Sequence, residues 1–146
     1  MSYFVAILAI LTALVVASLT KKESNKKKPS GNLMIFDTET NGIPTNWNAS
    51  PKDINNWLRM VSIAWYKIDP TGTVLDKQYH LIRPEGFTYN IEAVKIHGIT
   101  QEYASAHGTK LSTVLEKFLQ DVQDSKYLIA HNIDFDYAVL LCELIR

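Results

Sequence analysis

The sequence predicts an α/β domain whose mixed sheet combines a three-stranded antiparallel meander with one parallel strand, flanked by helices. Three observations predict this fold class: an apolar run that ends at two acids (residues 33–39), two strand-like runs around a turn (residues 58–83), and an amphipathic stretch leading into a short apolar run (residues 109–130). A helix between two strands is the usual connection of a right-handed parallel crossover. The last strand should therefore lie parallel to the first.

The N-terminal segment, residues 1–20, contains no charged side chain, and Tyr3 to Leu19 is almost wholly apolar. As a helix this run would cover roughly 26–30 Å, enough to cross a bilayer core. We predict an uncleaved transmembrane or signal-anchor helix; a cleaved secretory signal, with Val15 and Ala17 before the cut, is the alternative. No positive charge precedes the apolar run, which favours the anchor.

Residues 21–31 form a Lys-rich linker with five lysines and one acid. Positive charge collects on the cytoplasmic side of a membrane segment, so the chain is predicted to be single-pass and membrane-anchored, with residues 31–146 in the cytoplasm. The lysines either rest against anionic lipid headgroups or serve only as a charged spacer.

The remaining chain is a single domain at most, because the whole sequence has 146 residues. Its net charge is about −4 once the linker is set aside, with 10 basic and 14 acidic side chains. A mildly acidic domain binds nucleic acid poorly by charge alone, so a phosphate-containing substrate would need bound cations or a local basic patch. The single cysteine, Cys142, excludes an internal disulfide.

The first strand carries the most informative residues. Leu33 to Phe36 are four consecutive large apolar residues, typical of a strand covered on both faces. Asp37 and Glu39 follow at a spacing of two, which puts both on one face at the carboxyl end, where open α/β sheets bind ligands. Such close carboxylates repel, and a hard cation such as Mg²⁺ would hold both ionised. A strand end running into a polar turn, with Asp37 as a cap, explains the same spacing.

The next segment, residues 42–56, contains two prolines and several asparagines and is predicted to be an irregular loop beside the acids. Its Trp47, with Trp57 just beyond, either stacks on a base or packs over the edge of the domain. Residues 58–68 and 74–83 are then two strands around the turn at residues 69–73, a hairpin signature.

The helical part begins after residues 84–86 break the third strand. Ile91 to Ile96 is predicted to be a short helix with Gly98 as a left-handed C-cap. Thr109 is a plausible N-cap for a longer helix. The apolar positions of that helix recur at helical spacing: Leu111, Val114, Leu115, Phe118, Leu119 and Val122.

A second acidic segment follows the strand predicted at residues 127–130. Asp134 and Asp136 open a helix that runs to Arg146, and acids in a first helical turn are favoured by the helix dipole alone. A parallel neighbour of the first strand ends here, however, so these acids should lie beside Asp37 and Glu39. Three carboxylates that converge at one sheet edge are uncommon by chance.

Phe36-Asp37-Thr38-Glu39-Thr40 resembles the first exonuclease motif, and His131-Asn132-x-x-Phe135-Asp136 the second motif, of the DEDD (DnaQ-like) 3′→5′ exonucleases of the DEDDh branch. The resemblance implies a ribonuclease H-like fold over residues 32–146. It implies that Asp37, Glu39 and Asp136 are catalytic and bind two Mg²⁺ or Mn²⁺ ions, which activate a water and stabilise the leaving 3′-oxygen. Asp134 falls at a variable position and is expected to cap the helix.

The resemblance also implies a substrate site. His97-Gly98-Ile99-Thr100 is similar to a family segment near the 3′-terminal nucleotide. The residues expected to contact the 3′ end of single-stranded DNA or RNA are Thr38, Thr40, Gly42, Ile43, His97, Asn132 and Phe135. Nothing in the sequence separates DNA from RNA.

One part of the family pattern is missing. Its third motif, a His followed five residues later by a fourth metal-binding Asp, should come after the last helix, so residues 32–146 match only the N-terminal portion of such a domain. We expect these residues alone to be inactive or slow, because general-base catalysis typically contributes about 10²–10⁴-fold. Two functions stay open: a membrane-tethered exonuclease, or an inactive module that binds 3′ ends, a polymerase or another protein near the membrane.

Overall fold

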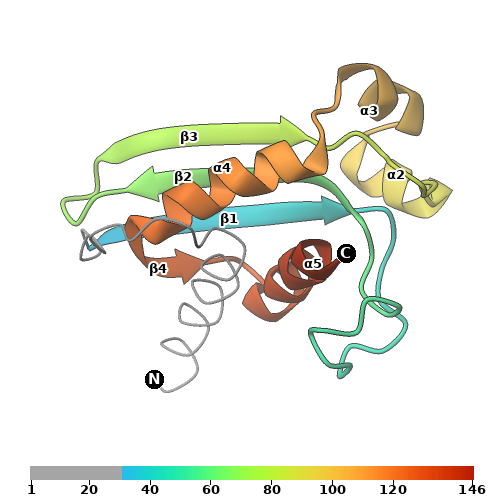
Figure 1. The fold of residues 1–146 in the computed structure, drawn as a ribbon, viewed down its shortest axis with the longest axis horizontal. Helices are drawn as coiled ribbons and strands as arrows, with labels where there is room; N and C mark the ends of the chain where they lie inside the picture. Colours follow the sequence, from blue (N-terminus) through green and yellow to red (C-terminus); the bar gives the residue numbers. More distant parts are fainter. Residues whose placement is uncertain (1–30) are drawn as a thin grey trace, which may run out of the picture.

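The computed structural model describes residues 31–146, which form a four-stranded sheet flanked by helices (Figure 1). The strands lie in the order β3-β2-β1-β4. Strands β1 (Asn32–Thr40), β2 (Met60–Ile68) and β3 (Val74–Leu81) form an antiparallel meander, and β4 (Ser125–Ile129) pairs with β1 in parallel. The predicted mixed sheet is confirmed, including the parallel crossover.

Strand β1 is buried on one face only, so the expectation of burial on both faces was wrong. Met34 and Phe36 are at most 2% exposed, whereas Ile35 is 39% exposed. Ile35 pairs with Tyr66 on β2 and with Ile129 on β4, which are each 38% exposed. Four apolar residues in a row supply only two side chains to each face, and here one pair fills the core while the other lines a half-exposed surface.

The core lies between the sheet and two helices that pack on the same face, α4 (Leu111–Gln123) and α5 (Ile133–Ile145) (Figure 1). The ring of Phe118 on α4 lies 5.4 Å from that of Phe36 and 5.3 Å from that of Trp65. All three side chains are at most 2% exposed. Aromatic contacts of this kind add to the stability gained by burial.

Two short helices precede α4. Helix α2 (Ile91–His97) ends at Gly98, whose φ of 74° confirms the predicted left-handed cap. Helix α3 (Gln101–His107) was not predicted from the sequence. Its signal is the hydroxyl of Thr100, which accepts a hydrogen bond from the N–H of Tyr103.

Thr109 is not the N-cap of α4, contrary to the sequence-based prediction. Its N–H donates to Leu81 and its carbonyl accepts from Arg83, so this residue extends the edge of β3 as an isolated bridge. Helix α4 begins at Leu111 after Lys110, which makes no side-chain capping bond. Thr109 therefore makes backbone hydrogen bonds at the end of β3 and does not cap α4, although the local sequence favoured a cap.

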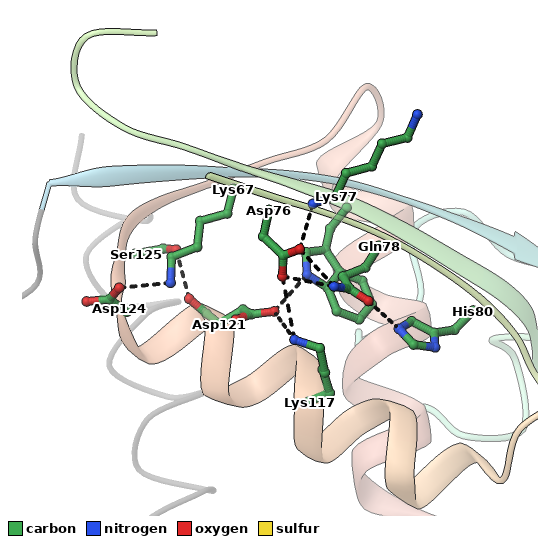
Figure 2. Close-up of polar contacts among 10 residues, drawn as sticks. Lys67, Asp76, Lys77, Gln78, His80, Lys117, Asp121, Asp124 and Ser125 are labelled. Carbon is green, nitrogen blue, oxygen red and sulfur yellow. Dashed lines mark hydrogen bonds and ion pairs between the residues drawn. The ribbon is translucent and has the colours of Figure 1, made fainter. Parts of the chain in front are cut away.

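A polar layer fastens α4 to the sheet (Figure 2). Asp121 accepts a hydrogen bond from the indole of Trp65 at 2.9 Å. Lys117 on the same helix lies 3.3 Å from Asp121 and 3.5 Å from Asp76 on β3. Just beyond the C-terminal end of α4, Lys67 pairs with Asp124 at 2.8 Å. These contacts set the position of α4, and through it the crossover that aligns β4 with β1.

The predicted membrane helix and the predicted linker up to residue 30 lie outside the described residues. Within residues 31–146, no helix has the length and apolarity that a membrane span needs.

Candidate active site

The carboxyl end of β1 presents two of the predicted acids. Asp37 and Glu39 alternate with Thr38 and Thr40, which are both 6% exposed. The acids therefore share one face, as the spacing predicted, and that face is the one opposite the core. The pairing with β2 shifts register between Glu39 and Thr40, which ends the regular ladder directly after the acidic pair.

The third acid comes from the first turn of α5, and the two candidates there differ in burial. Asp134 is exposed, whereas Asp136 is 3% exposed. Asp136 Oδ1 accepts two hydrogen bonds from Thr38, one from the backbone N–H at 3.0 Å and one from the hydroxyl at 2.7 Å. The structure thus brings Asp136, and not Asp134, against the strand that carries the other two acids.

The three carboxylates influence one another electrostatically. Burial raises the pKa of Glu39, and the negative charges of Asp37 and Asp136 raise it further. Burial also raises the pKa of Asp136, while the two hydrogen bonds from Thr38 oppose that shift. Repulsion among nearby carboxylates is the condition that a bound cation relieves.

The donor chemistry of this trio suits a hard divalent cation, because Mg²⁺ and Mn²⁺ prefer carboxylate oxygens. Among residues 31–146, however, no three His, Cys, Asp or Glu side chains are arranged closely enough to form a metal site as they stand. Asp136 turns Oδ1 toward Thr38, which leaves Oδ2 outside those two hydrogen bonds. The ligand set Asp37, Glu39 and Asp136 therefore remains a prediction.

A pocket of about 430 Å³ opens beside Glu39, a volume within the range of small-ligand sites. It lies between the end of β1, helix α2 and the start of α5. All seven residues predicted to contact substrate line it: Thr38, Thr40, Gly42, Ile43, His97, Asn132 and Phe135. Trp47, suggested from the sequence as a residue that could stack on a base, also lines the pocket. Sequence reasoning did not assign four further lining residues to the site, namely Asn90, Glu92, Ala93 and Ile96.

Asn41 positions α2 over the end of β1, which explains why only His97 of the wall formed by α2 was predicted. Its carbonyl accepts from the N–H of Asn90 at 3.1 Å, and its side-chain amide donates to Thr88 at 3.0 Å. Asn90 in turn caps α2 through the N–H of Glu92. The only local signal for this arrangement was the cap residue Asn90 before α2. The contact between Asn41 and Asn90, 49 positions apart, has no signal in the sequence.

His97 presents a buried donor at the pocket. Its Nδ1 accepts from the backbone N–H of Ile99 at 3.0 Å, so the neutral ring carries its proton on Nε2. Within the described chain, Nε2 is buried with no hydrogen-bond partner. Burial lowers the pKa of His97, and the nearby backbone of Thr40 opposes this shift without completing a hydrogen bond to Nε2.

The two tryptophans of the loop region differ. Trp57 is 4% exposed in a small core with Ala138 and Cys142, so its suggested role in stacking on a base was wrong. Trp47 is 56% exposed and lines the pocket. Phe135 lies between them, with its ring centroid 5.8 Å from that of Trp47 and 6.1 Å from that of Trp57.

A buried charge joins the end of this loop to α5. Glu143 has no exposed side-chain surface, and its carboxylate accepts from Arg59 Nε at 2.9 and 3.2 Å and from the N–H of Met60 at 2.8 Å. Arg146 lies 3.4 Å from the same carboxylate. Glu143 follows Asp136 by two helical turns, so this cluster also fixes the helix that carries the third acid.

Comparison with known proteins agrees with this geometry. The family model for the RNase T exonucleases matches residues 34–146. Among curated proteins, no sequence matches the chain. Solved structures with the same fold include E. coli exonuclease I in complex with a 5cy-dA13 oligonucleotide (TM-score 0.62, 21% identity, 75% of this chain and 23% of that chain). A product-bound exonuclease I (TM-score 0.61, 22% identity) covers 76% of this chain and 24% of that chain.

An exonuclease I complex with SSB-Ct is similar to the same degree (TM-score 0.61, 22% identity, 76% of this chain). The chain spans less than a quarter of the length of these exonuclease I chains. At 21–22% sequence identity, these structures show only that the fold is shared. The family model, in contrast, matches most of the chain. The chain therefore belongs to the RNase T exonuclease family, within the DEDD (DnaQ-like) superfamily that its two acidic motifs predicted.

Proposed function

We propose that this protein is a metal-dependent exonuclease that removes nucleotides one at a time from the 3′ end of single-stranded DNA or RNA. One observation carries the proposal: a pocket of nucleotide size opens beside Glu39, at the sheet edge where Asp37 and Asp136 also act on that carboxylate. A nucleotide bound in the pocket would have its phosphodiester next to the acids.

In this proposal Asp37, Glu39 and Asp136 hold two Mg²⁺ or Mn²⁺ ions. When bound, the ions supply a polarised water and stabilise the charge on the leaving 3′-oxygen. The protein's own residues orient the ligands and the substrate. Thr38 fixes the orientation of Asp136 through its N–H and its hydroxyl, and His97 offers an Nε2–H donor at the wall of the pocket.

The size of the site supports a single-stranded substrate. A pocket of about 430 Å³ leaves room for about one nucleotide, so we expect the terminal base to leave any base pair on entering it. The similar exonuclease I structure that contains a dA13 oligonucleotide supports the same substrate class.

Metal binding is the first test, with Asp136→Asn and Asp134→Asn as a matched pair from one helical turn. Mn²⁺ titration of the full chain, followed by calorimetry, should show binding in the parent and in Asp134→Asn, and about tenfold or greater weakening in Asp136→Asn. Equal binding by both variants would exclude Asp136 as a ligand.

The second test determines from which end the oligonucleotide is shortened. Because residues 32–146 match only the N-terminal portion of the family domain, any turnover should be slow, so the assay uses an excess of protein. A 5′-labelled single-stranded oligonucleotide with Mg²⁺ should then shorten in steps of one nucleotide, and the shortening should stop with EDTA or in Asp37→Asn. An oligonucleotide blocked by a 3′-phosphate should persist. Shortening that begins at the 5′ end, or that continues in Asp37→Asn, would contradict the proposal.

We further propose that residues 1–20 tether the protein to a membrane, with the nuclease domain in the cytoplasm. The support is the uncharged apolar run followed by five lysines. Detergent should be needed to extract the full chain from membranes, and protease should reach residues 31–146 only from the cytoplasmic side. Release by high salt alone would refute the tether.

A further inference from the structure

The side chain of Arg146 joins the C-terminal end of α5 to the loop between β1 and β2. Its Nη2 donates to two backbone carbonyls, those of Ile54 and Trp57, both at 2.6 Å. Its Nη1 lies 3.4 Å from the buried carboxylate of Glu143, one turn earlier in α5. An arginine can hold several acceptors at once because its donors form a rigid fork. The Arg146 side chain is only 18% exposed, so these partners fix it in one position.

The two carbonyls lie on either side of Asn56 in the sequence, and Asn56 holds the next part of the loop. Its side chain is buried, and Oδ1 accepts from the hydroxyl of Thr45 and from the N–H of Asn46, both at 2.9 Å. Its amide donates back to the carbonyl of Asn46 at 3.0 Å. Asn56 therefore fixes the backbone immediately before Trp47, a residue that lines the pocket.

Arg146 acts on the loop from far outside the acid trio. Asp136 lies in the first turn of α5, about 15 Å along the helix axis from Arg146 at 1.5 Å per residue. Glu143 keeps two other partners when Arg146 is removed, because Arg59 and the N–H of Met60 also donate to it. A change at Arg146 should therefore release the loop and leave the acids in place.

We propose that Arg146 is a positioning residue for the nucleic-acid substrate, which it does not touch. It holds the loop wall of the pocket through the backbone around Asn56 and the bonds of Asn56 to residues 45–46. This inference rests on the proposed function and names a residue, outside the pocket lining, on which substrate affinity depends. A wall that is ordered before binding raises affinity, because ordering it at the moment of binding would subtract from the free energy of association.

The test uses two binding measurements on the full chain, one for the acids and one for the pocket. Calorimetric titration with Mn²⁺ measures metal binding by the acids. Fluorescence anisotropy measures the dissociation constant of a 5′-labelled oligothymidylate, with Ca²⁺ in place of Mg²⁺ so that the oligonucleotide survives. The variants are Arg146→Ala, Arg146→Lys, Asn56→Ala and, as control, Arg83→Ala. Arg83 is an exposed arginine that does not line the pocket.

Arg146→Ala should weaken oligonucleotide binding by about 2- to 12-fold, the effect of ordering one side chain of the wall on binding. Its Mn²⁺ dissociation constant should stay within about twofold of the parent's, as expected for a distant site. Arg146→Lys keeps the charge but loses the fork, so it should bind the oligonucleotide as weakly as Arg146→Ala. Asn56→Ala should show a similar loss, and the double variant no larger one, because both residues act on the same wall. Arg83→Ala should bind like the parent.

Four results would overturn the inference. If Arg146→Ala binds the oligonucleotide as the parent does, Arg146 has no positioning role, while cleavage that depends on Asp37 would keep the proposed function. If Arg146→Lys retains full affinity, the positive charge acts on the substrate, and the bonds to the two carbonyls do not matter. If Mn²⁺ affinity falls as far as oligonucleotide affinity, the variant disturbs α5 as a whole. If the parent binds no oligonucleotide, both the inference and the proposed function fail. Should Arg146→Ala unfold, Asn56→Ala gives the same comparison, because it breaks the next contact toward the pocket.

Discussion

The hydroxyl and the backbone N–H of Thr38 donate to the same oxygen of Asp136, at 2.7 and 3.0 Å, across 98 positions in the sequence. Thr38 lies between Asp37 and Glu39 and points to the core, whereas its two neighbours point away from it. The strand therefore presents two acids on one face and holds the third acid from its other face. Asp136 is only 3% exposed, but it lies against the residue between Asp37 and Glu39. Its negative charge therefore still raises the pKa of Glu39.

Removing the Thr38 hydroxyl should expose its role in holding Asp136. Thr38→Val keeps the shape of the side chain and loses one hydrogen bond to a carboxylate, so the free energy of unfolding should fall by about 1.5–3 kcal/mol at pH 7. The pKa of Asp136 is already raised by burial and should rise further. The loss should shrink as pH falls through this raised pKa, because the protonated carboxyl is a weaker acceptor. Urea unfolding at pH 7 and pH 4 measures both effects.

Thr40→Val is the matched control for that prediction. Thr40 is as buried as Thr38, but its hydroxyl donates to the carbonyl of Gly42 at 2.6 Å. Its loss of about 0.5–1.5 kcal/mol should therefore be similar at both pH values. If the two variants show the same pH dependence, the Thr38 hydroxyl does not stabilise the charged form of Asp136.

Glu39→Gln should stabilise the metal-free protein at neutral pH. The pKa of Glu39 in the fold lies above its usual value of 4.5, because of burial and of Asp37 and Asp136. Ionisation of Glu39 thus opposes folding, and this effect appears as pH rises through 4.5 and is complete above the raised pKa. The melting temperature of Glu39→Gln in EDTA should exceed that of the parent at pH 7 and match it near pH 4. Added Mg²⁺ should reverse the order at pH 7, because only the parent keeps all three carboxylates. A lower melting temperature of Glu39→Gln in EDTA would contradict the repulsion.

Neighbouring residues on β1 should differ sharply in their contribution to stability. Phe36→Ala empties a position that is 2% exposed and packed on Phe118, so the free energy of unfolding should fall by about 3–5 kcal/mol. Ile35→Ala, at a position 39% exposed on the opposite face, should lower it by about 1 kcal/mol. Chemical denaturation of the two variants side by side measures the difference. Equal losses would mean that both faces of the strand are covered in solution.

The buried carboxylate of Glu143 should be among the most sensitive positions outside the acid trio. Glu143→Ala leaves Arg59 and the N–H of Met60 without their acceptor, and breaking a buried charge pair typically lowers the free energy of unfolding by about 3–5 kcal/mol. Lys95→Ala removes an exposed pair with Glu92 and should change stability by less than about 1 kcal/mol. Thermal melts would show whether this contrast holds; a small effect of Glu143→Ala would mean that the loop does not need its attachment to α5.

Acidification should weaken the fold partly through His97. Burial lowers the pKa of His97 below 6.5, so the unfolded chain binds its proton first as pH falls. Stability should therefore drop as pH falls from about 6.5 through the lowered pKa, and His97→Gln should show a smaller drop. His80, whose pKa is lowered by burial and by Lys117, should behave in the same way. Urea midpoints at pH 7.5 and 5.5 for the parent and each variant measure the slope; parallel profiles would show that these rings do not titrate with folding.

The sequence alone was sufficient for features whose causes are local or periodic. Alternation placed Asp37 and Glu39 on one face, and the 3.6-residue spacing from Leu111 to Val122 identified α4. The need for a crossover made β4 parallel to β1. Two short motifs identified the family because each combines strand, turn or helix start with the acids that its chemistry requires.

Tertiary structure decided what depends on contacts between distant segments. The backbone of Thr109 bonds to β3 in place of capping a helix, and Trp57 is buried while Trp47 stays open, although both follow the same strand. Asp134 and Asp136 differ by two positions, yet only Asp136 meets Thr38, because the packing of α5 on the sheet turns one side of that helix inward. The pocket lies between β1, α2 and α5, and the hydrogen bond between Asn41 and Asn90 holds α2 over the end of β1. A sequence pattern records which residues share a face, whereas the pairing of faces depends on packing among side chains far apart in the chain.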